Sequence, residues 1–207
     1  IELGLVGSEM CIRDRSRPDI PLHALSMYKM PREGLTNEPL KEIEELKKKG
    51  LPVTLVGDVM GTGSSRKSAT NSVLWHIGED IPFIPNKKTG GICIGEKVAP
   101  IFFNTMEDSG TLVFEADVEN LNMGDVISIF PAKGEIKDDE GKLITKFNLK
   151  SETFLDEVRA GGRIPLIIGR SLTDKSREYL NLSPSEVFVR PGMDDDSSEG
   201  YTLAQKM

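Results

Sequence analysis

Apolar residues recur every three to four positions in several stretches of the chain, which is the spacing of one face of a helix. In residues 38–49 this spacing places Leu40, Ile43 and Leu46 on one face, and Gly50 follows as a C-cap. The predicted helices are residues 38–49, a helix that begins at Ser64 or Ser65 and runs to Ile77, Pro100 to about Ser109, Ser151–Arg159 with Ser151 as its N-cap, and Thr173–Leu180.

Short apolar runs and alternating runs lie between these helices and predict strands. Continuous runs predict buried strands at Pro52–Val56, Gly91–Gly95 and Ile164–Ile168. Alternating or turn-bounded runs predict strands at Thr111–Val118, Val126–Phe130 and Leu143–Leu149, and a short extended piece at Phe83-Ile84. Buried strands that alternate with helices, with a hairpin-rich region over 111–149, predict one α/β domain with an antiparallel portion.

Composition narrows the function classes. The 207-residue chain has a net charge of −7, and it has no basic block that would favour binding to nucleic acid. No apolar run approaches the roughly 18 residues of a membrane span, so no membrane partner is expected. Cys11 and Cys93 form neither a disulfide framework nor a metal-site spacing, which favours a cytoplasmic location and a buried apolar role for Cys93. His23 and His76 are too far apart to suggest a metal centre, and packing or surface exposure is expected for His76.

A glycine-rich turn, Gly61-Thr-Gly-Ser-Ser-Arg66, connects an apolar strand to a helix. Helix N-termini carry unpaired N–H groups and the positive end of the macrodipole, so they attract anions. Ser64 and Ser65 can cap the helix, and the Arg66 guanidinium can hold a carboxylate through two parallel hydrogen bonds. The turn therefore predicts an anion site, although a tight capped turn without a ligand is the alternative.

Two familiar phosphate-binding motifs are excluded at this turn. A Walker A loop requires G-x-x-x-x-G-K-[ST], but Thr62 stands where the second glycine should be after Gly57. The dinucleotide fingerprint G-x-G-x-x-G fits only in its first half, because Arg66 occupies the third glycine position.

The turn and several longer strings resemble one known family. Gly-x-Gly-Ser-Ser-Arg after a strand resembles the swivel-domain signature of the aconitase superfamily. The more specific strings resemble the bacterial aconitate hydratase B branch over about Ser16 to Met207; they are Gly57–Trp75, Ala99–Asp108, Asn120–Asp125 and Glu157–Arg170. The resemblance implies a three-layer β/β/α swivel domain, like the small subunit of isopropylmalate isomerase.

The resemblance also implies roles for four residues. Ser64 would be the catalytic base and would contact the substrate, while Ser65 and Arg66 would bind substrate carboxylates. The residues alone do not distinguish the two serines. Arg17, in Ser16-Arg-Pro18, would bind another carboxylate; without the resemblance it reads as an ordinary surface arginine.

The activity implied is aconitate hydratase, a hydro-lyase of the tricarboxylic acid cycle that isomerises citrate and isocitrate through cis-aconitate, with 2-methylisocitrate as a further substrate class. The family's [4Fe–4S] cluster is held by cysteines of later domains, so this chain is expected to bind no metal or cluster and to be inactive alone. Its partners would be a tricarboxylate, the missing iron–sulfur domains and, for the apo form, messenger RNA. Two alternatives stay open: the small subunit of an isopropylmalate-isomerase-like hydro-lyase, and an RNA-binding module of an apo-aconitase.

The first fifteen residues differ from the rest of the chain. Val6–Arg15 resembles translated sequencing-adapter sequence, and the segment lacks the pattern of a secretory signal. We therefore expect residues 1–15 to be a non-native leader, residues 16–190 to form the swivel domain, and residues 191–207 to be a linker towards the iron–sulfur domains.

Overall fold

A parallel sheet forms the centre of the computed structural model, which describes residues 39–62, 66–85, 87–122 and 124–189. Its strands are β1 (Thr54–Met60), β4 (Ile92–Val98) and β5 (Leu112–Glu115), in the spatial order β1-β4-β5. Both neighbouring pairs run parallel, with Met60 opposite Val98 and Ile92 opposite Leu112. The predicted strand at Pro52–Val56 therefore begins later and extends to the glycine-rich turn.

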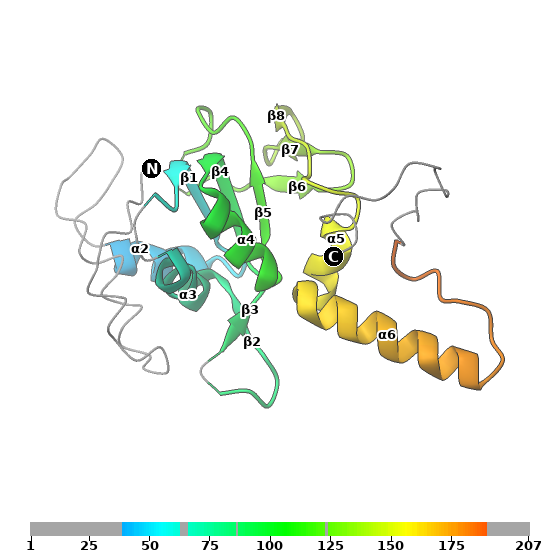
Figure 1. Cartoon of the computed structure of the whole chain (residues 1–207). Coiled ribbons are helices and arrows are strands. Elements are labelled where there is room, and N and C mark those ends of the chain that lie inside the picture. Colours follow the sequence, from blue (N-terminus) through cyan, green and yellow to red (C-terminus); the bar gives the residue numbers. More distant parts are fainter. Residues whose placement is uncertain (1–38, 63–65, 86, 123, 190–207) are drawn as a thin grey trace.

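Two helices connect these strands and cover the same face of the sheet (Figure 1). They are α3 (Arg66–Ile77) and α4 (Pro100–Asp108), both close to their predicted positions. Their apolar sides meet the sheet in a core in which Val73, Ile94, Phe102, Met106 and Val113 are almost fully buried. The buried strands of this layer are rich in Val, Ile and Leu, as is typical of parallel sheets that helices cover.

The remaining elements surround this layer. They are α2 (Pro39–Lys48), the hairpin β2 (Glu79–Asp80) and β3 (Lys88–Thr89), the antiparallel sheet β6 (Ser128–Phe130), β7 (Glu135–Lys137) and β8 (Leu143–Lys146), and the helices α5 (Phe154–Ala160) and α6 (Arg163–Tyr179). The antiparallel sheet adjoins β5, because Phe114 stacks on Phe147 with ring centroids 3.9 Å apart and Ala116 bridges to Phe147. Within the described residues, no helix combines the length and the apolar character that crossing a membrane requires.

The prediction of a buried strand at Ile164–Ile168 is wrong. These residues form the first turns of α6, which continues through the segment predicted separately as the last helix. Pro165 does not prevent this, because the first N–H groups of a helix have no intrahelical partner. Leu166 alone of this run is buried, whereas Ile164, Ile167 and Ile168 are exposed. A short apolar run does not by itself distinguish a strand from a helix.

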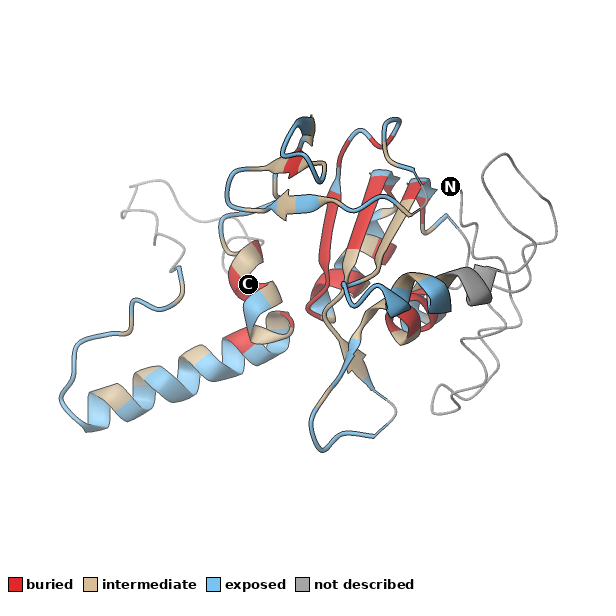
Figure 2. Cartoon of the chain, turned by 180° about the vertical axis from the view of Figure 1, so that it is seen from behind, coloured by how far each residue is buried: buried red, intermediate tan, exposed pale blue. Residues whose placement is uncertain are grey.

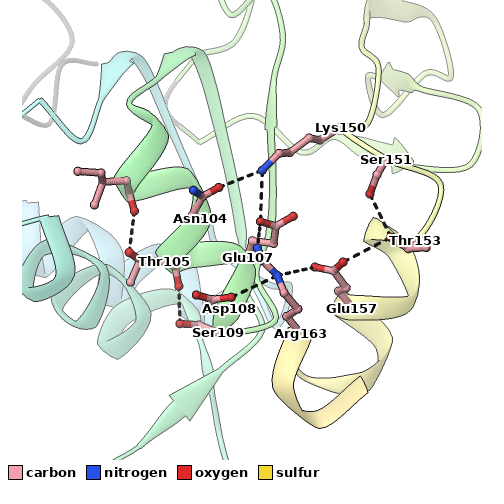
Figure 3. Close-up of polar contacts among 11 residues, drawn as sticks. Asn104, Thr105, Glu107, Asp108, Ser109, Lys150, Ser151, Thr153, Glu157 and Arg163 are labelled. Atoms are coloured by element: carbon pink, nitrogen blue, oxygen red, sulfur yellow. Dashed lines mark hydrogen bonds and ion pairs between the residues drawn. The ribbon is translucent and has the colours of Figure 1, made fainter. Parts of the chain in front are cut away.

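Two smaller predictions are also corrected. Phe83 lies in a turn with a φ of 65° rather than in an extended segment. The N-cap of α5 is Thr153, which makes no side-chain capping bond, so Ser151 is not the cap. The Ser151 hydroxyl instead lies 3.2 Å from the Thr153 hydroxyl (Figure 3).

Buried carboxylates join α4, α5 and the start of α6 (Figure 3). The Glu107 side chain is only 4% exposed and accepts hydrogen bonds from Arg163 and, at 3.5 Å, from Lys150 Nζ. Arg163 Nε also lies 3.6 Å from Glu157 Oε2 and 3.5 Å from Asp108 Oδ1. One guanidinium therefore compensates carboxylates from two helices, which orients α6 relative to the sheet layer.

Glu157 should make the stability of the domain depend on pH. Burial raises the pKa of Glu157 above its ordinary value of 4.5, and the Glu107 carboxylate raises it further, whereas Arg163 and Thr153 lower it. The folded state then holds this proton more tightly than the unfolded state. The stabilisation that this bound proton provides is fully present below pH 4.5, the ordinary pKa of the side chain. It is lost as the pH rises through the raised pKa of Glu157. We expect Glu157→Gln to unfold at a higher urea concentration than the wild type at neutral pH, with the difference vanishing in acid.

The matched control for this experiment is Glu152→Gln, which changes an exposed carboxyl just before the same helix. Urea titrations of both variants between about pH 4.5 and about pH 7 measure the effect. An equal response of the two variants to pH would contradict the assignment to Glu157.

Candidate functional site

The carboxyl ends of β1 and β4 lie at one edge of the parallel sheet, and α3 and α4 both begin there (Figure 1). The Ala99 N–H, just before α4, donates to the Met60 carbonyl at the end of β1 over 2.9 Å. This bond joins the two strand ends directly. Ligand sites of parallel α/β sheets form outside this edge, where loops and helix N-termini converge.

Gly61 begins the turn and is held against α4. Its φ is 74°, a left-handed conformation that favours glycine. A Cβ at this position would lie 2.2 Å from Phe102 Cβ, although Phe102 is a buried core residue of α4. The turn therefore leaves β1 in close contact with the core.

Arg66 is the first residue of α3 and is half-buried at this edge. The Thr70 hydroxyl, on a fully buried side chain, donates to the Arg66 carbonyl over 3.1 Å and stabilises this first turn. The first turn of α3 contains no acidic residue that would compete for the guanidinium. The positive end of a twelve-residue helix and a guanidinium thus lie together, an arrangement that can bind a carboxylate.

The other predicted site residues lie outside the described part of the chain. Ser64 and Ser65 precede Arg66 directly, and Arg17 lies in the N-terminal segment. Of the four predicted residues the structure describes Arg66, which lies at the sheet edge, and the roles of all four stay predictions.

A hollow of about 340 Å³ lies next to the beginning of α4, and its lining is mostly apolar. It is lined by Val98, Pro100, Phe103, Asn104, Phe114, Glu115, Asn148 and Lys150. Lys150 Nζ lies 2.9 Å from Asn104 Oδ1 and also contacts the Phe103 ring and the Glu107 carboxylate. The sequence gives no local sign of Lys150, because no motif surrounds it and its partners are more than forty residues away.

The described residues do not fit a cluster or metal site. No group of three or more His, Cys, Asp or Glu side chains among them could hold a metal ion. Cys93 is fully buried in β4, with its Sγ 3.5 Å from Met60 Sδ, and burial raises the pKa of its thiol to about 12. Cluster ligation requires a thiolate, so this thiol is unsuited to it. The predicted role of Cys93 as a small buried apolar residue is confirmed.

Arg163 and Arg170 lie on α6 at either end of the apolar run 164–168, and both pair with carboxylates of other helices. Arg163 pairs with Glu107, and Arg170 Nη2 lies 3.7 Å from Asp156 Oδ2 and donates to the Val189 carbonyl. Neither arginine lies at the edge where α3 begins. Among the arginines that the structure describes, Arg66 is thus the one beside the glycine-rich turn.

A parallel sheet with helices on one face and an arginine-bearing helix at its carboxyl edge defines an α/β domain. The 3-isopropylmalate dehydratase (leuD) from Methanocaldococcus jannaschii has a similar structure, with a TM-score of 0.57 over 84% of this chain and 89% of that chain. At 18% sequence identity, this likeness shows that the two chains share a fold and shows nothing about function. It confirms the predicted class of α/β swivel domain.

Sequence comparison defines the family. The family model described as "Aconitate hydratase 2 N-terminus" matches residues 12–201. Aconitate hydratase B from Synechocystis is 65% identical over 194 residues, and the Escherichia coli protein is 60% identical over 199 residues. Each match covers 93% of this chain but only 22% or 23% of the relative. The chain belongs to the aconitate hydratase B family, and it spans about a fifth of the length of these relatives.

Proposed function

We propose that this chain supplies one wall of the active site of an aconitate hydratase. That enzyme is a hydro-lyase of the tricarboxylic acid cycle, which interconverts citrate and isocitrate through cis-aconitate. The observation that carries the proposal is Arg66 at the start of α3, beside the Gly61 turn and at the carboxyl edge of the sheet. Family membership at 57–65% identity supports the choice of substrate class.

The proposed chemistry is proton removal from a carbon next to a carboxylate. Ser64 acts as the base, although a serine hydroxyl has a high pKa and needs its alkoxide stabilised. Backbone N–H groups at the start of a helix, together with a nearby guanidinium, can supply that stabilisation. Ser65 and Arg66 hold one substrate carboxylate at this edge, and Arg17 holds another.

The rest of the enzyme lies outside the residues described. A [4Fe–4S] cluster is expected elsewhere in the full-length protein, held by cysteines of its iron–sulfur domains. The 207-residue chain alone is therefore expected to have no hydratase activity. Residues 16–190 form the swivel domain in this proposal, between the leader 1–15 and the linker 191–207, in a cytoplasmic enzyme. Binding of messenger RNA and acceptance of 2-methylisocitrate stay predictions.

Arg66→Lys should raise the KM for citrate and lower kcat. A lysine keeps the charge, but it cannot form the two parallel N–H bonds of a guanidinium to a carboxylate. One lost charge-assisted bond of about 1.5–3 kcal/mol corresponds to roughly a ten- to hundredfold change in KM. The measurement uses steady-state kinetics of a chimera, a full-length Synechocystis enzyme in which this chain replaces the matched segment.

The matched control is Lys67→Gln, which removes an exposed cation next to Arg66. Its kinetics should equal those of the unsubstituted chimera. Arg17→Lys in the same chimera tests the second predicted arginine: unchanged KM and kcat would make Arg17 an ordinary surface residue. Unchanged kinetics of Arg66→Lys would contradict the proposed site. Turnover of 3-isopropylmalate instead of citrate would favour the isomerase-like alternative.

A further inference from the structure

One side of the first half of α6 carries exposed apolar residues. Ile164, Ile168 and Leu172 follow one another at intervals of four residues, and their side chains are 59%, 53% and 62% exposed. Residues four apart lie on the same side of a helix. Figure 2 shows α6 extending away from the parallel sheet with most of its surface exposed. We call these three residues the α6 face, and Gly169, three residues before Leu172, lies next to it.

The other side of α6 already has partners within the chain. Leu166 is buried, Arg170 pairs with Asp156 of α5, and Arg177 donates to the Ser183 carbonyl. These contacts fix α6 relative to α5 and to the segment that follows it. The α6 face is therefore held in a defined orientation, while its own apolar side chains remain largely in contact with water.

Gly169 adds a second observation on the same helix. It lies in the middle of α6, and nothing in the described chain lies within 4 Å of the position that a Cβ would occupy. A glycine inside a helix destabilises it by comparison with alanine, because the unfolded backbone is more flexible. No close contact with the described residues requires this glycine. A glycine on an exposed helix permits the close approach of another backbone.

The α6 face lies at the opposite end of α4 from the proposed site. Helix α4 begins beside Met60 at the carboxyl edge of the sheet, where Ala99 N–H donates to the Met60 carbonyl. It ends at Asp108, which contacts Arg163, the first residue of α6. A partner on the α6 face would thus be bound away from Arg66.

We propose that the α6 face is the docking surface through which this domain packs against the remainder of the full-length aconitate hydratase polypeptide. This inference rests on the proposed function. The relatives are over four times as long as the matched segment, since that segment is 22% of the Synechocystis protein. Stable association of separate chains usually takes about 20–30 residues a side, far more than one helix face offers. A partner within the same polypeptide needs less, because the covalent link already holds it at a high effective concentration.

Thiol labelling of Leu172→Cys tests the docking. Cys11→Ser leaves Cys93 as the other cysteine of the 207-residue chain, and Cys93 is fully buried. The thiol should react freely in the 207-residue chain at any protein concentration. In the chimera it should react at least about tenfold more slowly, because the docked interface must dissociate locally before the reagent can reach the thiol. Leu143→Cys on β8, at 42% exposure, is the control and should react equally in both proteins.

Equal labelling of Leu172→Cys in chain and chimera would overturn the proposal. The proposal would also be overturned if the labelling rate of the 207-residue chain fell as its concentration rose and sedimentation showed a dimer. A second copy of the chain would then cover the α6 face. Equal protection of Leu143→Cys would also overturn it, because burial would not be specific to α6. Labelling needs no turnover: an inactive chimera that still protects Leu172→Cys would contradict the proposed function while supporting the docking.

Gly169→Ala provides an independent measurement. In the 207-residue chain the alanine should raise Tm by about 2–4 °C, because it favours the helix and meets no neighbour. In the chimera it should lower Tm, because the methyl group would meet the docked backbone. A rise of equal size in both proteins would contradict a close approach at Gly169.

Discussion

Ser64→Ala in the chimera should lower kcat for citrate dehydration by about a hundred- to ten-thousandfold, with little change in KM. A general base contributes a factor of this size to the rate, and its loss removes an interaction made in the transition state rather than in binding. The motivation is the position of Ser64 just before α3, whose first residue is Arg66. Rates of cis-aconitate formation over a range of citrate concentrations give both constants.

The neighbouring serine is the matched control. Ser65→Ala removes the same hydroxyl one residue later, and it should mainly raise KM because Ser65 is proposed to bind a carboxylate. A Ser64→Ala chimera with near-normal kcat would remove Ser64 from the mechanism. If Ser65→Ala instead shows the large loss in kcat, the roles of the two serines are exchanged.

Gly162→Ala should lower the free energy of unfolding by about 3 kcal/mol or more, because strain and a steric clash add at this position. Gly162 precedes α6 with φ 126° and ψ 170°, a region that is accessible essentially to glycine alone. A Cβ there would lie 2.2 Å from the backbone oxygen of Asp108, which cannot move without disturbing the end of α4. Urea unfolding of the 207-residue chain measures the loss.

Gly141→Ala separates the clash from the backbone strain. Gly141 also has a positive φ, 83°, but no atom of the residues that the structure describes lies within 4 Å of its Cβ position. This control should therefore lose only about 1–2 kcal/mol, the usual penalty for a left-handed residue with a side chain. Equal losses in the two variants would show that α4 and the start of α6 are less closely packed than described.

Local patterns predicted the helices well where a periodic stretch had clear ends. Helix α4 begins at Pro100, because proline suits the first turn of a helix. Helix α3 ends at Ile77, where the glycine that follows indicated a helix end. The same patterns failed at Ile164–Ile168, because a run of five residues is compatible with both a strand and a helix. Burial would have decided between them, and burial depends on residues distant in the sequence.

The candidate site was predictable only in part. The strand, glycine-rich turn and helix indicated an anion site, and the structure places Arg66 at the carboxyl edge of the sheet. The contact of Gly61 with Phe102 was not predictable, because it joins residues forty-one positions apart through the packing of α4. Lys150 near the hollow was missed for the same reason, since no local pattern connects it to Asn104.

The sequence by itself determined the family, the α/β class, the glycine-rich turn before α3 and the apolar character of Cys93. These properties depend on local motifs and on residue type, which a single chain displays directly. Only the tertiary structure decided that Arg163 joins Glu107 and Glu157, that Gly162 lies against Asp108, and that α6 leaves an apolar face uncovered. These properties arise from contacts between segments far apart in the chain, and no local spacing encodes which segments meet.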